Sequence, residues 1–276
     1  MNIGPIETVT ILTRDLDKSA AMYISAFEWQ QRDGQGQVSQ EQAKLWGAEN
    51  MAVSKMLEVA GINGGVRFIE RPDLQSTEPL RTFGWTALEI CVNDVNRYVD
   101  RAVAAGFRVL NEAVPLAGSE KPLPLIAAQL AGINGEVVYI TQILSEVPNF
   151  ELPDVSKESG SIFICVLGAS NLEQSREAIE SNFEVRRASD REVAIKVINR
   201  VYEKDLTTLH RISSLQLSGR NAIEIDQMPI EAKPRNVVIG NLPAGISMVS
   251  VIADVSEARV IQLPDSARLE LVPAKG

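Results

Sequence analysis

"VTILTRDLDKS", from Val9 to Ser19, is the stretch that decides the fold. Apolar residues alternate along its first half, which is typical of a strand with one buried face. Asp15 follows, and a helical pattern begins after it with one apolar stripe formed by Leu16, Ala20, Tyr23 and Phe27. The Asp15 carboxylate can accept a hydrogen bond from a free N–H of the first helical turn. The stretch therefore predicts a strand followed at once by a capped helix.

The same arrangement returns three times along the chain. The later copies are "LEICVNDVNRY" (88–98), "FICVLGASNLEQS" (163–175) and "MVSVIADVSEA" (248–258). The capping residues are Asp15, Asp94, Asn171 and Asp254, with gaps of 79, 77 and 83 residues. Strand-like segments follow each helical pattern, so the repeated unit reads β-α-β-β-β. This regularity predicts an α+β fold of four modules arranged in two pairs.

The chain order suggests how these modules form domains. Residues 1–147 are expected to form the first paired-module domain and residues 161–276 the second. Residues 148–160, "PNFELPDVSKESG", form the expected linker because they hold two prolines and end in glycine. The fourth module is expected to be shortened, with its helix lost or reduced to a turn. Two short extra helical stretches, "QEQAKLWG" and "EVAIKVINRVYEK", belong to the first and third modules.

Composition limits the classes of partner and chemistry. The formal net charge of −9 argues against nucleic acid, whose phosphates need a basic surface. No run of 18 apolar residues exists, so no membrane partner is expected. Cys91 and Cys165 lie in apolar runs and are interpreted as buried thiols of a cytoplasmic protein without a secretory signal. His210 is the single histidine, which excludes metal sites built from several histidines of one chain.

Four such units resemble the vicinal oxygen chelate superfamily, which includes glyoxalase I, extradiol dioxygenases and bleomycin-binding proteins. The resemblance is carried by "VTILTRDLDKSAAMY", "LEICVNDVNRYVDRAVAAGFRV", "INGEVVYI" and "RNAIEIDQMP". It implies that each pair of modules makes a cup-shaped mixed sheet around a small-molecule ligand, with helices outside. In this superfamily a cup forms within one chain or across a homodimer, and the sequence leaves both arrangements open.

The resemblance also implies where metal ligands would stand. The positions on the first strands, seven residues before each cap, and on the last strands are Thr8, Ala87, Ile164, Ser247, Phe68, Tyr139, Glu224 and Glu270. The four that fall in the first pair cannot hold a divalent cation. We therefore expect no metal and no cofactor, and we do not expect a metal-dependent extradiol dioxygenase. The alternative is a hard cation such as Mg²⁺ or Ca²⁺ held by Glu224 and Glu270.

Alternation, in phase with the ligand positions that the resemblance implies, predicts which side chains of the first pair face the cup. The expected ligand-binding residues are Thr8, Thr10, Phe68, Glu70, Ala87, Cys91 and Thr141. Glu89 is the candidate acid or base, because a carboxylate on an apolar strand is paired or has a raised pKa. Tyr139 is the candidate hydrogen-bond donor to a substrate carbonyl. Glu89 has two other interpretations, an ordinary polar group of the cup and an outward-facing residue if the strand is shifted by one.

The second pair offers a weaker candidate cluster, His210 with Glu224 and Glu270. A lone histidine on a strand is more often a structural hydrogen-bonding group. The favoured function is a metal-independent lyase or isomerase acting on a small carbonyl-containing molecule, aromatic or aliphatic, in the first cup. The alternatives are a protein that binds and sequesters a hydrophobic small molecule, and a scaffold whose cup is filled by side chains.

Overall fold

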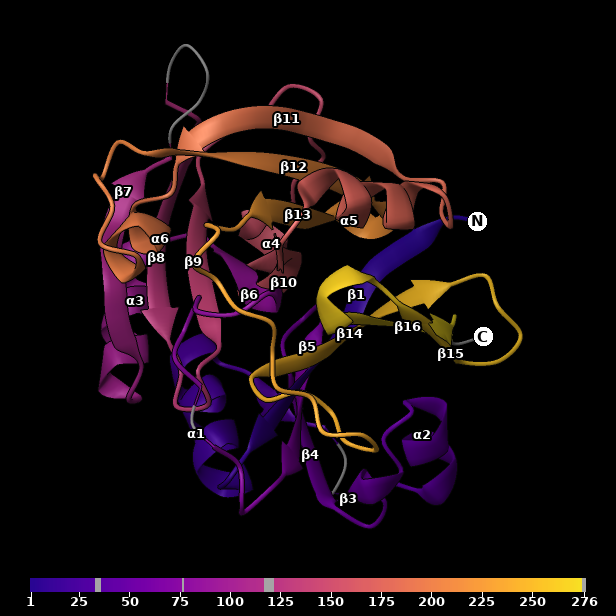
Figure 1. Ribbon diagram of the computed structural model, residues 1–276. Coiled ribbons are helices and arrows are strands. Elements are labelled where there is room, and N and C mark those ends of the chain that lie inside the picture. Colours follow the sequence, from indigo (N-terminus) through magenta and orange to yellow (C-terminus); the bar gives the residue numbers. More distant parts are fainter. Residues whose placement is uncertain (33–35, 76, 117–121, 275–276) are drawn as a thin grey trace.

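Two eight-stranded sheets form the framework of the protein in a computed structural model (Figure 1). The structure describes residues 1–32, 36–75, 77–116 and 122–274. Sheet 1 contains β1 (Ile3–Thr13), β2 (Gln30–Gln31), β3 (Gly36–Gln37), β4 (Lys55–Ala60), β5 (Gly65–Glu70), β14 (Ile246–Ala253), β15 (Arg259–Gln262) and β16 (Arg268–Pro273). Sheet 2 contains β6 (Gly84–Val92), β7 (Arg108–Pro115), β8 (Leu125–Ala131), β9 (Val137–Ile143), β10 (Ser161–Ala169), β11 (Arg186–Ala194), β12 (Leu209–Leu217) and β13 (Asn221–Gln227).

The helices are α1 (Leu16–Phe27), α2 (Gln40–Leu45), α3 (Val95–Ala104), α4 (Val155–Glu158), α5 (Leu172–Glu180) and α6 (Lys196–Val201). The helices α1, α3 and α5 begin where the sequence predicts them, whereas α4 lies in the expected linker and α6 begins four residues later than expected, after the end of β11. Asp15, Asp94 and Asn171 cap α1, α3 and α5, each accepting from a backbone N–H three residues ahead at 2.9–3.1 Å. Among the described residues no helix separates β14 from β15, so the fourth module is shortened as expected.

The modules pair in an order that the sequence does not reveal. Sheet 1 runs β15-β16-β14-β1-β5-β4-β2 with β3 on β4, and sheet 2 runs β11-β12-β13-β10-β6-β9-β8-β7. The first module therefore joins the fourth through β1 and β14, and the second joins the third through β6 and β10. The expectation that the first two modules share one cup is wrong. An isolated module would leave one edge of its first strand unpaired, and the local sequence does not specify which other module pairs with that edge.

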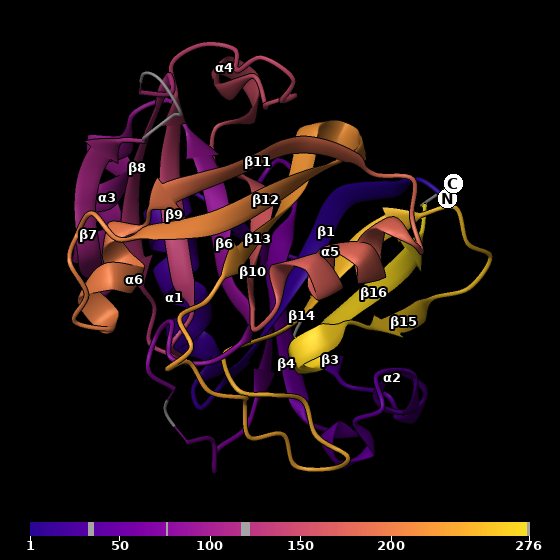
Figure 2. The ribbon, with the colours of Figure 1, turned by 45° about the horizontal axis from the view of Figure 1, so that its top comes forward.

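Each sheet is completed within one chain and buries one face against helices. On that face of sheet 1, Tyr23 and Phe27 of α1 contact the rings of Phe68, Tyr98 and Phe107. The other face of each sheet forms the inside of a cup. In Figures 1 and 2, β11 and β12 curve across sheet 2 toward β7 and β8.

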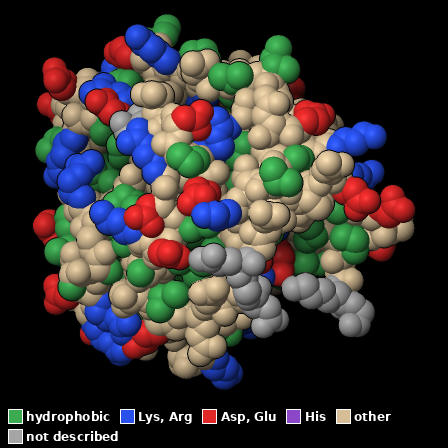
Figure 3. All heavy atoms as spheres, turned by 90° about the horizontal axis from the view of Figure 1, so that it is seen from below, with side chains coloured by type: hydrophobic (Ala, Val, Ile, Leu, Met, Phe, Trp, Pro, Cys, Tyr) green, Lys and Arg blue, Asp and Glu red, His purple; other side chains and the backbone are tan. Residues whose placement is uncertain are grey.

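The surface has no concentration of one side-chain type on the face seen from below, where acidic, basic and hydrophobic groups are interspersed (Figure 3). Among the described residues, no helix is both long enough and apolar enough to cross a membrane.

Candidate functional site

The cup of sheet 1 is filled by the chain's own side chains, and we call it the filled cup. Trp46, which directly follows α2, is 1% exposed and packs with Met51 and Met248. Its indole N–H donates to Glu270 at 2.7 Å. The Arg67 guanidinium lies 3.3 Å from the other Glu270 oxygen and 5.3 Å from the Trp46 ring centroid. The carboxylate at the floor of this cup is therefore already bound by a cation and an aromatic N–H.

Several predicted ligand-binding residues lie in sheet 1, either inside the filled cup or on the opposite face of the sheet, which α1 covers. Thr8 and Thr10 are buried, and Thr10 accepts a hydrogen bond from Arg67 at 3.4 Å. The expectation that Phe68 faces the cup is wrong, because its ring packs on Tyr23 of α1 at 5.4 Å. Glu70 shares the face of Phe68 by alternation and forms an ion pair with Lys55 at 3.6 Å.

The error at Phe68 has a simple geometric cause. In the β4–β5 hairpin Ala60 pairs with Gly65, whereas in the β8–β9 hairpin Ala131 pairs with Val137. The first hairpin is therefore one residue shorter, and a one-residue change moves a strand's side chains to the other face. Arg67, not Phe68, corresponds to the cup-facing Tyr139.

The cup of sheet 2 holds a cavity of about 200 Å³, and we call it the open cup. This volume is below the ~300–1,000 Å³ of pockets for drug-sized ligands, so it suits a smaller molecule. The polar lining residues are Glu89, Asn111, Gln129, Tyr139, Arg191, Lys196 and Glu224. Phe150, Phe163 and Ile164 are among the apolar ones. Phe150 comes from segment 148–160, so the expected linker supplies part of the wall.

Strand register explains why the polar groups meet. Glu89 on β6 is directly beside Tyr139 on β9, and Tyr139 is beside Gln129 on β8. On the other side Glu89 pairs with Ile164 of β10, whose neighbour β13 carries Glu224. Leu88 and Ile90 pack in the helix-side core, so alternation turns Glu89 into the cup. The outward-facing alternative for Glu89 is therefore wrong.

Glu89 is a buried acid at the floor of the open cup. It is 5% exposed and accepts one hydrogen bond, from the Thr141 hydroxyl at 3.1 Å. Burial, together with the nearby charge of Glu224, raises the pKa of Glu89 to about 8. The side chain can therefore exchange a proton near neutral pH.

Other acids surround Glu89. Burial raises the pKa of Glu224, which accepts from the Ser214 hydroxyl at 3.4 Å. Burial and the charges of Glu224 and Glu89 raise the pKa of Asp226 well above its usual range. The pKa of Tyr139 is raised by burial and by Asp226, Glu89 and Glu224, which keeps its hydroxyl protonated as a donor.

Arg191 is the cation that faces these acids from β11. Its charge lowers the pKa values of Glu89, Glu224 and Asp226 against the effect of burial. Its Nε atom is buried without a hydrogen-bond partner among the described residues. None of the ion pairs found in the described part of the chain includes Arg191. The open cup thus contains an excess of acids over cations.

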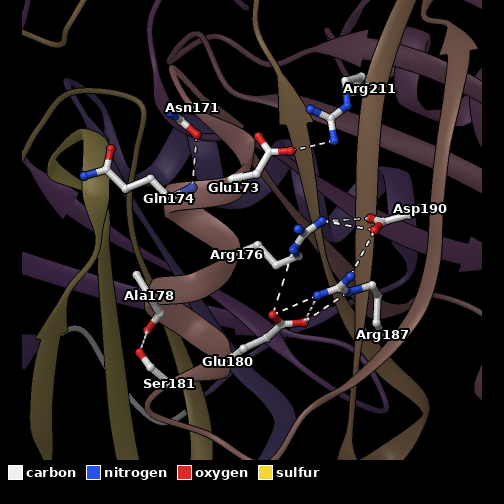
Figure 4. Close-up of polar contacts among 10 residues, drawn as sticks. All are labelled: Asn171, Glu173, Gln174, Arg176, Ala178, Glu180, Ser181, Arg187, Asp190 and Arg211. Atoms are coloured by element: carbon white, nitrogen blue, oxygen red, sulfur yellow. Dashed lines mark hydrogen bonds and ion pairs between the residues drawn. The ribbon is translucent and has the colours of Figure 1, made fainter.

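The strand that carries Arg191 is fixed from the opposite face by α5 (Figure 4). Arg176 of α5 lies 3.0 Å from Asp190, and Arg187 bridges Asp190 and Glu180 at 3.3 and 2.8 Å. Glu173 pairs with Arg211 of β12 at 2.6 Å. These contacts fix β11 and β12, the two strands at one edge of sheet 2, against α5.

The residues at the superfamily's metal-ligand positions do not suit a metal in either cup. The open cup places Ala87, Ile164, Tyr139 and Glu224 there, and two of these have no ligand atom. In the filled cup Glu270 is occupied by Arg67 and Trp46. Across the described residues, no group of three or more His, Cys, Asp or Glu side chains is placed to hold a metal ion. The alternative of a cation shared by Glu224 and Glu270 is wrong, because they lie in different sheets.

The remaining predicted residues lie near the cavity without lining it. Ala87 and Cys91 pack in the apolar cluster under the open cup, and the Cys91 thiol donates to the Glu158 carbonyl at 3.4 Å. His210 is hydrogen-bonded to Asn199 at 2.7 Å and does not line the cavity. Burial lowers the pKa of His210. The cluster of His210 with Glu224 and Glu270 does not form, whereas Glu224 joins Glu89 and Tyr139.

The sequence analysis missed four polar residues of the open cup: Asn111, Gln129, Arg191 and Lys196. Gln129 and Asn111 are 5% and 6% exposed, and each lies opposite the next strand's cup-facing residue. Alternation applied to every strand of the second module would have selected both. Arg191 and Lys196 belong to the third module, so only the observed pairing of modules brings them to this cavity.

Similarity to known proteins is found when structures are compared and not when sequences are compared. No protein-family model and no curated protein matches the sequence. Glyoxalase I from Zea mays superposes with a TM-score of 0.61 at 13% identity, covering 97% of this chain and 92% of that one. A protein from Bacillus subtilis subsp. subtilis str. 168, proposed to be a dioxygenase, superposes with a TM-score of 0.64 at 10% identity, covering 100% and 86%. Together with the four repeated modules and two cups, these likenesses show that the chain has the vicinal oxygen chelate fold.

Proposed function

We propose that the open cup binds a small carbonyl-containing molecule and that the protein is a metal-independent lyase or isomerase. Glu89 would remove or return a proton next to the carbonyl. Tyr139 would donate a hydrogen bond to the carbonyl oxygen as negative charge develops there. This assignment moves the ligand from a cup of the first two modules to the cup formed by the second and third.

One observation carries the proposal. Glu89 is a buried acid whose pKa is raised to about 8, and it lies beside a protonated tyrosine on the floor of a cavity. A general base works best when its pKa is close to the working pH, because it is then both available and strong. Glu89 and Tyr139 occupy neighbouring positions on two parallel strands, so both side chains can reach the same carbonyl group of a bound molecule.

The binding-protein alternative is favoured by the apolar part of the cavity. Phe150, Phe163 and Ile164 can bury a hydrophobic ring without any chemical step. The scaffold alternative applies to the filled cup, whose interior is occupied by Trp46.

Proton exchange tests the catalytic proposal. Acetophenone in D₂O is incubated with the protein, and loss of its methyl proton signal is followed by NMR. We expect exchange above the buffer rate, rising with pH toward about 8 as Glu89 ionises. Glu89→Gln should abolish the enhancement while acetophenone still perturbs signals of the open cup. The matched control is Glu192→Gln on the exposed side of β11.

The outcomes separate the alternatives. Binding without exchange in the unmodified protein would favour the binding-protein function. Neither binding nor exchange would contradict a carbonyl site in the open cup. Stoichiometric transition metal in the purified, active protein would contradict metal independence.

A further inference from the structure

We propose that the ligand of the open cup carries a cationic nitrogen group attached to a flat ring, as an aryl amidinium or a benzylammonium does, and that this group binds between Glu224 and Glu89. The inference rests on the proposed function, because it specifies the ligand class of the same cavity. It is drawn from the filled cup, which shows how this fold satisfies the corresponding carboxylate.

The two cups correspond residue by residue through their registers. Glu270 pairs with Ser250, which pairs with Thr8, and Glu224 pairs with Val166, which pairs with Ala87. Thr8 and Ala87 are equivalent positions of the repeat, so Glu270 and Glu224 are equivalent carboxylates. In the same way, the pair Thr10 and Arg67 of sheet 1 corresponds to the pair Glu89 and Tyr139 of sheet 2.

In the filled cup the chain itself supplies the partners of the carboxylate. Glu270 receives the Trp46 indole N–H at 2.7 Å, the Arg67 guanidinium at 3.3 Å and the Ser250 hydroxyl. Arg67 also lies over the Trp46 ring, so the cation and the aromatic plane form one unit. This unit satisfies a buried charge that would otherwise be costly.

The open cup has the carboxylate without that unit. Tyr139 stands where Arg67 stands in the filled cup, and Glu89 adds an acid where Thr10 stands. Glu224 accepts from the Ser214 hydroxyl at 3.4 Å and interacts with the neighbouring Asp226, and Val166 replaces the Ser250 donor. Both Glu89 and Glu224 line the cavity, so a bound molecule can reach their carboxyl groups.

Acidic groups outnumber basic ones around the cavity, so an acid that gives up its proton can neutralise an incoming cation. Glu89, Glu224 and Asp226 face one guanidinium, that of Arg191, and Lys196 is exposed at the rim. An incoming cation would allow Glu89 to ionise and would release its proton. Phe150, Phe163 and Tyr139 supply aromatic surface for the ring. The ligand would thus occupy the place that Trp46 and Arg67 occupy in the other cup.

Three probes of nearly equal shape test the charge requirement: benzamidinium, benzamide and benzoate. We expect benzamidinium to bind at least about tenfold more tightly than benzamide at pH 7.5, and benzoate to bind most weakly. Titration calorimetry in two buffers of different ionisation heat should show proton release on benzamidinium binding. Glu224→Gln and Glu89→Gln should each remove most of the preference, whereas the surface control Glu192→Gln should keep it.

The charge preference of the unmodified protein decides the matter even if a variant fails to fold. Benzamide or benzoate binding as tightly as benzamidinium in the open cup would overturn the cation inference and leave the carbonyl site standing. No binding of any probe would overturn it as well. If acetophenone then also showed neither binding nor exchange, the proposed function would fail with it.

Discussion

The two cups of this chain are built on the same repeat, and they treat the same carboxylate in opposite ways. Glu270 in the filled cup is enclosed by Trp46 and Arg67, whereas Glu224 in the open cup faces a cavity with Glu89 beside it. The difference comes from two features, the stretch after α2 that brings Trp46 inward and the exchange of Arg67 for Tyr139. The interior of one copy is therefore occupied by side chains, and the other retains a cavity.

The largest expected effect comes from emptying the filled cup. Trp46→Ala removes a fully buried ring and its hydrogen bond to Glu270, so the free energy of unfolding should fall by about 3–5 kcal/mol. Indole should raise the melting temperature of this variant, because a ligand that binds only the folded state stabilises it. Differential scanning calorimetry with and without indole measures both effects.

The matched change in the open cup is Tyr139→Phe, which removes a hydroxyl and leaves the ring. We expect it to change stability by less than about 1 kcal/mol, since no hydrogen bond from this hydroxyl to the described protein is lost.

If indole fails to stabilise Trp46→Ala, the filled cup collapses when it is emptied and is not a latent copy of the open one.

Neutralising the two equivalent carboxylates should give opposite results. Glu270→Gln leaves Arg67 with Glu58 as its remaining partner, so stability should fall by about 3 kcal/mol. Glu224→Gln removes an acid whose pKa is already raised by burial, so stability at pH 8 should be unchanged or higher. Urea unfolding at pH 8 checks both variants, and equal losses would show that the two carboxylates are alike after all.

The raised pKa values also predict how stability depends on pH. Burial raises the pKa of Glu89 to about 8 and that of Glu136, in the β8–β9 turn, to about 7. The folded protein therefore keeps protons that the unfolded chain loses above its ordinary pKa of 4.5. Their contribution is fully present below pH 4.5 and is lost as pH rises to about 8, at up to about 1.4 kcal/mol per pH unit for each group.

Urea unfolding between pH 5 and 8.5 measures this slope. Glu89→Gln should make the slope less steep up to about pH 8, and Glu136→Gln should make it less steep only below about pH 7. Glu270→Gln should lower the whole curve and keep the slope. A stability that rises with pH across this range would contradict the protonated states assigned to the open cup.

The sequence predicts contacts between residues that are close along the chain better than contacts between distant modules. Asp15, Asp94 and Asn171 cap helices through contacts three residues away, so the module pattern is visible in the sequence. Glu89 and Tyr139 lie in one module, and their meeting follows from alternation together with the strand order that the family resemblance implies. The approach of Glu224 depends on which free strand edges join, and no local pattern encodes that choice.

The filled cup shows a second limit of the sequence. The helical stretch before Trp46 is visible, but its docking onto Glu270 is a contact across 224 residues. The Phe68 error came from one residue of hairpin length, which reverses the faces of β5. The repeats therefore predict the architecture, whereas single insertions and long-range pairing decide which cup stays open.

The smallest expected effect tests whether α5 controls the open cup from outside. Asp190→Asn weakens the ion pairs from Arg176 and Arg187 that hold β11 (Figure 4). These pairs are partly exposed, so stability should fall by less than about 1 kcal/mol. Arg191 is the next residue and lines the cavity. A looser β11 should therefore change the dissociation constant of benzamidinium about two- to fivefold, as measured by calorimetry.

Glu173→Gln is the control, because it breaks the pair with Arg211 of β12 from the same helix and leaves Asp190 in place. If both variants changed binding equally, α5 would act on the sheet as a whole and not through β11. If Asp190→Asn changed stability but not binding, the position of Arg191 would be set within the cup by the acids that it faces. A change in binding confined to Asp190→Asn would show that the edge strand sets the charge balance of the open cup.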